Sequence, residues 1–231
     1  MTRIKICGLM RDEDIRLCTQ AGVQALGFVV EYPIDVPWNL DRIAARTLMG
    51  GVPPFVTRVI VVGDDPGTVI DLAKILKPHV VQLHGSEPLS VTASLVAEIK
   101  ALGVQVIKAL RFSIVTGKCC SACEDPVEAA KRIEDTGVDA LVLDSVGEAL
   151  PAGTGQSIDW SMAREIRDNV RLPVILAGGL NSSNVSRAVA AVHPYGVDVI
   201  SGVENPVGRK DPDKVRAFIE AVMGSRFKVM K

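Results

Sequence analysis

A cysteine and an aspartate, far apart in the chain, each end a short apolar segment typical of a buried β-strand. Cys7 ends Lys5-Ile6-Cys7 and is followed by a glycine, and Asp144 ends Leu141-Val142-Leu143-Asp144. Thiol and carboxyl groups can take up and release protons during catalysis. If both strands belong to one parallel sheet, the two groups lie on the same rim, where α/β folds build their active sites. Cys7 is therefore the candidate base and Asp144 the candidate acid.

Two charged residues are expected beside the thiol. Side chains alternate along a strand, so a Cys7 that points into the mouth of a barrel places Lys5 inward one layer below it. An ammonium group there favours the thiolate and is expected to lower the Cys7 pKa from about 8.5 toward neutrality. Asp198 is also predicted to point inward and to neutralise Lys5. The alternative is that Cys7 is a small core residue and Asp144 a cap.

The elements that position these residues alternate regularly along the chain. Eight short β-rich segments are predicted at 4–7, 25–30, 57–62, 80–83, 105–109, 140–144, 174–177 and 197–201. Helical patterns follow them at 12–20, 41–49, 66–76, 88–102, 126–135, 161–169, 183–192 and 212–223. Eight β-then-α units in succession predict a single (β/α)8 TIM barrel, of class α/β, as one domain over 1–231. The basic end at 225–231 is expected to be a frayed tail.

The bulk composition excludes several classes of protein. The chain has 231 residues, 48% of them hydrophobic, and a formal net charge of -1. One full core is therefore expected, and no field that would recruit nucleic acid or an anionic membrane. No apolar run reaches the roughly 20 residues that cross a bilayer, so we expect a soluble cytoplasmic protein. Cys119, Cys120 and Cys123 crowd one loop, but no second Cys/His cluster completes a zinc site, so neither a metal nor a disulfide framework is expected.

Glycines follow the last two predicted strands. Gly178-Gly179 comes after the seventh strand and Ser201-Gly202 after the eighth. Glycines let backbone N–H groups approach an anion closely, and the loops after strands seven and eight are the usual phosphate site of barrels. The alternative is that they only form tight turns. The longest loops, at 31–40, 111–124 and 145–159, also follow strands and open on the same face.

Three further residues are weaker candidates for contact with a ligand. His84 ends the fourth strand, although a lone histidine at a rim is more often a structural hydrogen-bonding residue. Gly155, in Gly153-Thr154-Gly155, lies in a loop flexible enough to fold over a ligand, or in an idle surface turn. Arg58 lies on the third strand, where its side chain can point into the barrel. There it would meet an anionic substrate or pair with an acid.

The motifs at these strand ends resemble one known family. They are Lys5-Ile6-Cys7-Gly8, Gly27-Phe28-Val29, Val81-Gln82-Leu83-His84-Gly85, Leu143-Asp144, Gly153-Thr154-Gly155 with Asp159-Trp160, Ala177-Gly178-Gly179-Leu180-Asn181, Val197-Asp198-Val199, Ser201-Gly202-Val203-Glu204 and Lys210-Asp211. Their order and spacing, from residue 4 to about 223, are similar to those of phosphoribosylanthranilate isomerase of tryptophan biosynthesis.

The resemblance implies an activity and a role for each residue. It implies an Amadori rearrangement of phosphoribosylanthranilate, without metal or organic cofactor, by a monomer or homodimer whose partner is a phosphorylated small molecule. Cys7 takes the position of the general base and Asp144 that of the general acid. Gly178, Gly179, Ser201 and Gly202 would bind the phosphate, and the remaining candidates, Arg58, His84, Gly155 and Asp198, would contact the rest of the substrate.

One segment departs from the family pattern. Members commonly carry a Ser-x-Arg stretch after the second strand, whose arginine meets the anthranilate carboxylate, but here the segment is Pro33-Ile34-Asp35-Val36-Pro37-Trp38-Asn39-Leu40. Either Arg58 or Arg111 supplies the cation, with Arg58 favoured because a strand holds it, or the preference for the aromatic group has changed. A barrel isomerase for another phosphosugar, and a catalytically silent barrel that binds a phosphometabolite, remain alternatives.

Overall fold

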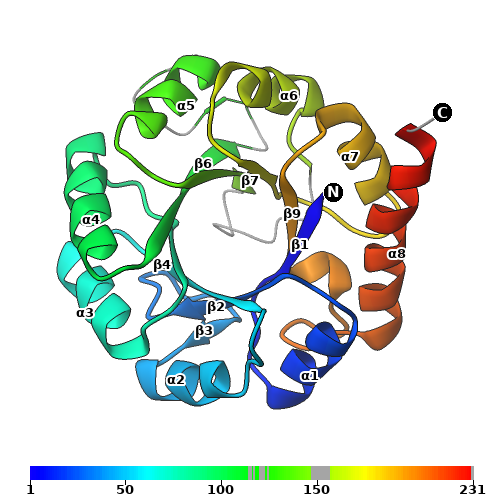
Figure 1. The fold of residues 1–231 in the computed structure, drawn as a ribbon, viewed down its shortest axis with the longest axis horizontal. Helices are drawn as coiled ribbons and strands as arrows, with labels where there is room; N and C mark the ends of the chain where they lie inside the picture. Colours follow the sequence, from blue (N-terminus) through cyan, green and yellow to red (C-terminus); the bar gives the residue numbers. More distant parts are fainter. Residues whose placement is uncertain (114–115, 117, 120–122, 124, 147–156, 230–231) are drawn as a thin grey trace.

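Parallel strands and surrounding helices form a closed barrel (Figure 1). The computed structural model describes residues 1–229 except 114–115, 117, 120–122, 124 and 147–156, and omits the side chains of 225–229. The strands are β1 (Arg3–Ile6), β2 (Ala25–Val30), β3 (Asn39–Leu40), β4 (Thr57–Val62), β5 (Val80–Leu83), β6 (Gln105–Ser113), β7 (Ala140–Val146), β8 (Val174–Leu176) and β9 (Gly196–Val199). The order around the barrel is β1-β9-β8-β7-β6-β5-β4-β2, and β1 pairs with β2 to close it. The predicted (β/α)8 barrel is confirmed.

Helices cover the outside of this barrel in Figure 1. They are α1 (Asp12–Gln20), α2 (Arg42–Gly50), α3 (Pro66–Leu76), α4 (Leu89–Ala101), α5 (Pro126–Glu134), α6 (Trp160–Asn169), α7 (Val185–Val192) and α8 (Pro212–Val229), with a short 3₁₀ helix, η1 (Ser201–Val203), after β9. Aspartates at 41, 65, 125 and 159 cap four of them by accepting hydrogen bonds from backbone N–H groups of the first turn. The last helix was expected to end at residue 223, but α8 continues to Val229. The fraying of 225–231 stays a prediction. Over the described ranges, no helix is long and apolar enough to cross a membrane.

The side chains inside the barrel form separate layers. Outward-facing residues such as Ile4, Ile6 and Ile60 pack against the helices in the main core. Inside, the amino-terminal half is filled by small apolar side chains, including those of Val59 and Val142. A second apolar cluster, which contains Cys7, lies at the opposite end. The buried Lys5 and Asp198 side chains form an ion pair inside the barrel, so the sequence places charged groups in its interior.

One short strand was not expected from the sequence. β3 pairs with the end of β2, where Asn39 and Leu40 lie opposite Val29 and Val30. β4 pairs with one edge of β2 as far as Val29. β3 therefore pairs with the opposite edge, whose first residues, Ala25 and Leu26, pair with β1. The backbone at 38–40 therefore continues in line with β1, just beyond Cys7.

Candidate active site

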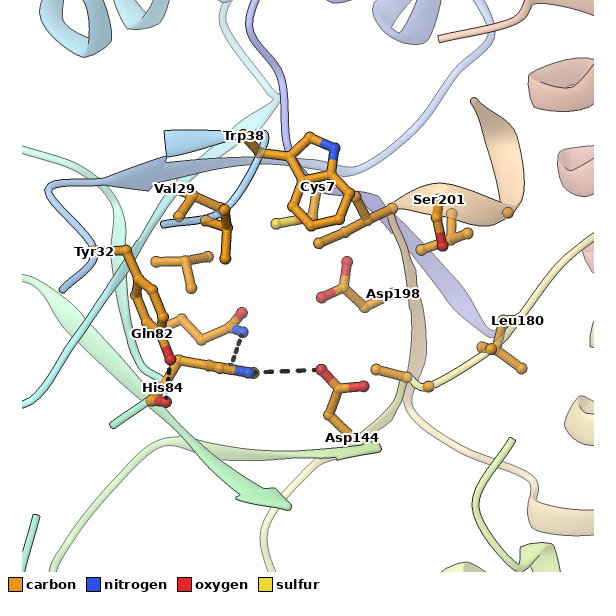
Figure 2. A pocket seen from close by; sticks show the side chains of 18 residues that line it. Cys7, Val29, Tyr32, Trp38, Gln82, His84, Asp144, Leu180, Asp198 and Ser201 are labelled. Carbon is orange, nitrogen blue, oxygen red and sulfur yellow. Dashed lines mark hydrogen bonds and ion pairs between the residues drawn. The ribbon is translucent and has the colours of Figure 1, made fainter. Parts of the chain in front are cut away.

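A pocket opens at the carboxyl ends of the strands, and most of the predicted site residues line it. The space between its lining atoms is about 680 Å³, open solvent at its mouth included. Figure 2 shows Cys7 and Asp144 on opposite sides of it, with Asp198 between them. The other predicted residues that line it are His84, Gly178, Gly179, Ser201 and Gly202. Gly155 lies outside the described residues.

Cys7 is held at the end of β1 by its backbone and by the space that a glycine leaves. Its N–H donates to the carbonyl of Val199, 2.9 Å away, and its side chain is 2% exposed. A Cβ on Gly27 of the neighbouring strand would lie 2.5 Å from the Cys7 Sγ atom. A larger residue at position 27 would therefore displace the thiol.

The charges around Cys7 correct the expectation for its pKa. Lys5 forms the predicted buried ion pair with Asp198, with 2.6 Å between Nζ and Oδ2. Burial raises the pKa of the Cys7 thiol, while Lys5 and Lys210 lower it and Asp198 raises it again. The expected depression of the pKa is wrong because desolvation outweighs the ammonium groups and the Asp198 carboxylate offsets Lys5. Cys7 rests as a thiol.

Asp144 is a carboxyl whose environment suits an acid at neutral pH. Burial raises its pKa to about 7, and the negative charge of Asp198 contributes to the rise. The backbone N–H of Ser145 and the cations Lys5 and Arg111 oppose it. A substantial share of Asp144 is therefore protonated near neutrality, as proton donation requires.

His84 faces Asp144 as a neutral imidazole. Burial, reinforced by three cations beginning with Arg111, lowers its pKa to about 3, so the 3.6 Å approach of Nε2 to Asp144 Oδ2 is no ion pair. The Gln82 amide lies 3.3 Å from Nδ1 and can donate to it, which leaves the ring proton on Nε2. Within the described part of the chain, Nε2 has no hydrogen-bond partner. It therefore offers a donor to a ligand in the pocket.

Two glycine loops meet on the side of the pocket nearest β8 and β9. Gly178 and Gly179 have φ angles of +79° and +60°, which favour glycine. A Cβ on Gly202 would lie 1.9 Å from the carbonyl oxygen of Leu180, in the other loop. The absence of side chains thus lets the two loops pack directly against each other.

The structure corrects the prediction for Arg58. Its backbone pairs with Leu26 near the start of β4, and its guanidinium lies 3.2 Å from His79 Nε2 at the amino-terminal end of the barrel. Because Val59 points into the barrel, Arg58 points outward. It contacts neither the rim nor the pocket. Arg111, in register with Asp144 near the end of β6, donates a hydrogen bond to Ser86 Oγ at the mouth.

Sequence reasoning assigned no role to three polar residues near the site. Gln82 orients His84, and Glu204 and Lys210 form a buried ion pair behind Cys7. Gln82 has a visible signal, since it is the one polar residue in Val80-Val81-Gln82-Leu83. Across the described residues, no group of three or more His, Cys, Asp or Glu side chains is placed to hold a metal ion.

This arrangement places the chain among (β/α)8-barrel enzymes, which work at the carboxyl rim of the barrel. The family model described as N-(5'phosphoribosyl)anthranilate (PRA) isomerase matches residues 4–221, and the chain belongs to this family. It is 41% identical over 223 residues to N-(5'-phosphoribosyl)anthranilate isomerase of Methanocella arvoryzae, covering 96% of this chain and 98% of the relative.

Solved structures of the family agree with this assignment. One is phosphoribosyl anthranilate isomerase in complex with reduced 1-(o-carboxyphenylamino)-1-deoxyribulose 5-phosphate, with a TM-score of 0.77, 33% identity, and 97% and 100% of the two chains covered. Another contains monomers generated from the dimeric isomerase of Thermotoga maritima, with a TM-score of 0.76, 30% identity and the same coverage.

Proposed function

We infer that the chain converts N-(5'-phosphoribosyl)anthranilate into 1-(2-carboxyphenylamino)-1-deoxyribulose 5-phosphate in tryptophan biosynthesis. The observation that carries the assignment is the placement of Cys7 and Asp144 across one pocket in a member of this family. A barrel that only binds a metabolite has no need of an acid and a base facing each other. The cytoplasm is the proposed location, and a reducing compartment suits the free thiols of Cys7 and Cys18.

The proposed mechanism gives each of the two groups one proton transfer. Asp144 protonates the ring oxygen of the ribose as the ring opens to an imine. Cys7, as thiolate, removes the proton from C2 and gives an enolamine, which tautomerises to the ketone. His84 Nε2 and the Asp198 Oδ1 atom, buried without a partner among the described residues, offer a donor and an acceptor for sugar hydroxyls. Gly178, Gly179, Ser201 and Gly202 hold the phosphate through backbone N–H groups.

A fluorescence assay tests the function directly. Purified protein is mixed with freshly made phosphoribosylanthranilate, and the loss of substrate fluorescence is followed, with the Asp144→Asn variant as control. Turnover that depends on Asp144 supports the assignment. A folded protein that leaves the substrate unchanged contradicts it, and activity on another phosphosugar would then favour a different isomerase of the same fold.

Arg111 is the proposed partner of the substrate carboxylate. The carboxylate loses water as it enters the pocket, and a hydrogen bond to a charged group is worth about 1.5–3 kcal/mol, so Arg111→Ala is expected to raise KM at least about tenfold. The effect on kcat should be small. Steady-state kinetics check this, with Arg58→Ala as the matched control because Arg58 lies at the opposite end of the barrel. An unchanged KM in Arg111→Ala contradicts the assignment.

We propose that the chain forms a homodimer through the amino-terminal face of its barrel. Phe55 on this face is fully exposed and has a φ of +69°, which is unusual for a bulky residue. It borders a cavity that Tyr195 and Arg3 also line, with the Arg3 guanidinium 4.0 Å above the Tyr195 ring. Because the protruding ring and the cavity share one face, a two-fold axis can place each Phe55 in the cavity of the other copy.

Light scattering coupled to gel filtration measures this state. The expected mass is twice that of the 24.6 kDa chain, and Phe55→Glu is expected to elute as a monomer because it buries a charge in an apolar contact. Ile43→Glu, at another exposed apolar position, is the matched control and should remain dimeric. A monomeric parent protein, or a dimeric Phe55→Glu variant, rejects this interface.

A further inference from the structure

The pocket wall beside Cys7 is the indole of Trp38 (Figure 2). Trp38 is 3% exposed and belongs, with Cys7, to the apolar cluster at the barrel mouth. Among the described residues that line the pocket, none is a lysine or an arginine. The side of the pocket next to the thiol therefore offers an aromatic surface and aliphatic side chains.

A buried ion pair fixes the orientation of this indole. Its Nε1–H donates to both carboxylate oxygens of Glu204, at 2.9 and 3.1 Å. The Lys210 ammonium donates to Glu204 Oε1 and to the backbone carbonyl of Cys7, both at 2.6 Å. The Lys210 and Glu204 side chains are 0% and 1% exposed. Because such a pair is costly to bury unless its hydrogen bonds are made, the network selects one indole position relative to Cys7.

The segment that carries Trp38 is itself firmly held. The Asn39 side chain bonds both backbone groups of Tyr32, accepting from its N–H and donating to its carbonyl, each at 2.9 Å. Glu31 has a φ of +44°. Its carboxylate forms a bidentate ion pair with the Arg42 guanidinium, with N–O distances of 2.6 and 2.7 Å. These hydrogen bonds and this ion pair hold both ends of the loop between β2 and β3, so the backbone that carries the indole is rigid.

We propose that Trp38 determines specificity for the aromatic part of the substrate, by packing against its ring, and that Glu204 and Lys210 are positioning residues for Trp38. The inference rests on the proposed function. Cys7 must reach C2 of the sugar, and the neighbouring carbon C1 carries the arylamino nitrogen. The glycine loops follow β8 and β9, and β9 is next to β1 in the barrel. With the phosphate in these loops, the aromatic ring extends past Cys7 toward β2 and β4, into the apolar cluster in which Trp38 forms the wall.

The first test compares two ligands that differ in the aromatic group. Reduced 1-(o-carboxyphenylamino)-1-deoxyribulose 5-phosphate carries it, and ribulose 5-phosphate lacks it. Trp38→Leu is expected to raise the dissociation constant of the aromatic ligand at least about tenfold, and that of ribulose 5-phosphate less than about twofold. Trp38→Phe, which keeps an aromatic face, should lie between. Equal weakening of both ligands, or no weakening of either, overturns the proposal.

The second test needs no substitution at Trp38. The chain has two tryptophans. Trp160, at the start of α6, does not line the pocket, and its buried N–H has no hydrogen-bond partner within the described part of the chain, so Trp160→Phe removes no known bond there. In this variant Trp38 is the only tryptophan. Saturation with the aromatic ligand is expected to change its emission, whereas ribulose 5-phosphate should not. An unchanged emission with the aromatic ligand bound overturns the proposal.

Glu204→Gln tests the positioning role. The amide keeps an acceptor for the indole N–H but loses the charge that faces Lys210, so the indole is less firmly placed. We expect KM to rise several-fold with kcat nearly unchanged. A lower thermal stability with the parent KM would mean a structural role only and would reject positioning. Parent protein that lacks isomerase activity defeats the proposed function, whereas an active parent whose Trp38→Leu variant discriminates normally defeats this inference alone.

Discussion

Replacement of Asp144 by Asn, or of Cys7 by Ala, is expected to reduce kcat by at least about 10²-fold to 10⁴-fold, the usual contribution of a positioned acid or base. Asn keeps the size and polarity of Asp144 but carries no transferable proton. Ala removes the only atom of Cys7 that accepts one. The effect should fall on kcat, because the glycine loops proposed to bind the phosphate are untouched.

Kinetics on folded variants decide this prediction. Circular dichroism and thermal melting should show a retained fold, and Cys18→Ala serves as the matched control, since Cys18 is a buried thiol outside the pocket. Burial raises the pKa of the Cys18 thiol to about 12, which makes it inert. Near-normal turnover in either active-site variant would remove that residue from the mechanism.

The pH profile of kcat/KM is a second measurement of the same pair. The proposed mechanism needs Asp144 protonated and Cys7 ionised, yet the Asp144 pKa is about 7 and burial raises the Cys7 pKa above its ordinary value. Between the two pKa values, Asp144 is mainly a carboxylate and Cys7 mainly a thiol. The productive form, with Asp144 protonated and Cys7 a thiolate, carries the same total charge and is the minor form. Activity should therefore fall below about pH 7 and again in the alkaline range where Cys7 loses its proton, as a bell-shaped curve of macroscopic pKa values.

The sequence predicted the features that depend on local pattern. Alternating strands and helices predicted the barrel, and the alternation of side chains along β1 predicted the Lys5–Asp198 contact. Arg58 was misplaced because its direction follows from Val59 and Val61 pointing inward, and the uniformly apolar positions 59–62 of this strand give no sign of which set faces the helices. The Cys7 pKa was misjudged because desolvation depends on the packed surroundings of the thiol.

Long-range contacts account for what the sequence could not show. Trp38 and Glu204 are separated by 166 positions, and no local periodicity links them. β3 has two residues and forms because the edge of β2 beyond β1 is open to pairing. Both features complete the mouth of the barrel, and both require the closed barrel to exist first.

Gly202→Ala is the second substitution expected to have a large effect. The added Cβ would lie 1.9 Å from the carbonyl oxygen of Leu180, so the two loops proposed to hold the phosphate must separate. The phosphate then loses at least two of its charge-assisted hydrogen bonds, each worth about 1.5–3 kcal/mol, and kcat/KM should fall at least about 10²-fold. Gly50→Ala, where a Cβ meets open space, is the matched control.

Competition by inorganic phosphate separates this cause from a general loss of structure. A folded Gly202→Ala protein should bind the phosphate ion more weakly than the parent, since the ion would use the backbone donors proposed for the substrate phosphate. Gly178→Ala gives a second approach from the other loop, because its Cβ would lie 2.8 Å from Ser145 Oγ and its φ is +79°. Parent-like kcat/KM in both variants would move the phosphate site away from these loops. A loss shared by both, with phosphate inhibition weakened in parallel, supports an anion site where β8 and β9 end, because each substitution alters a different one of the two loops.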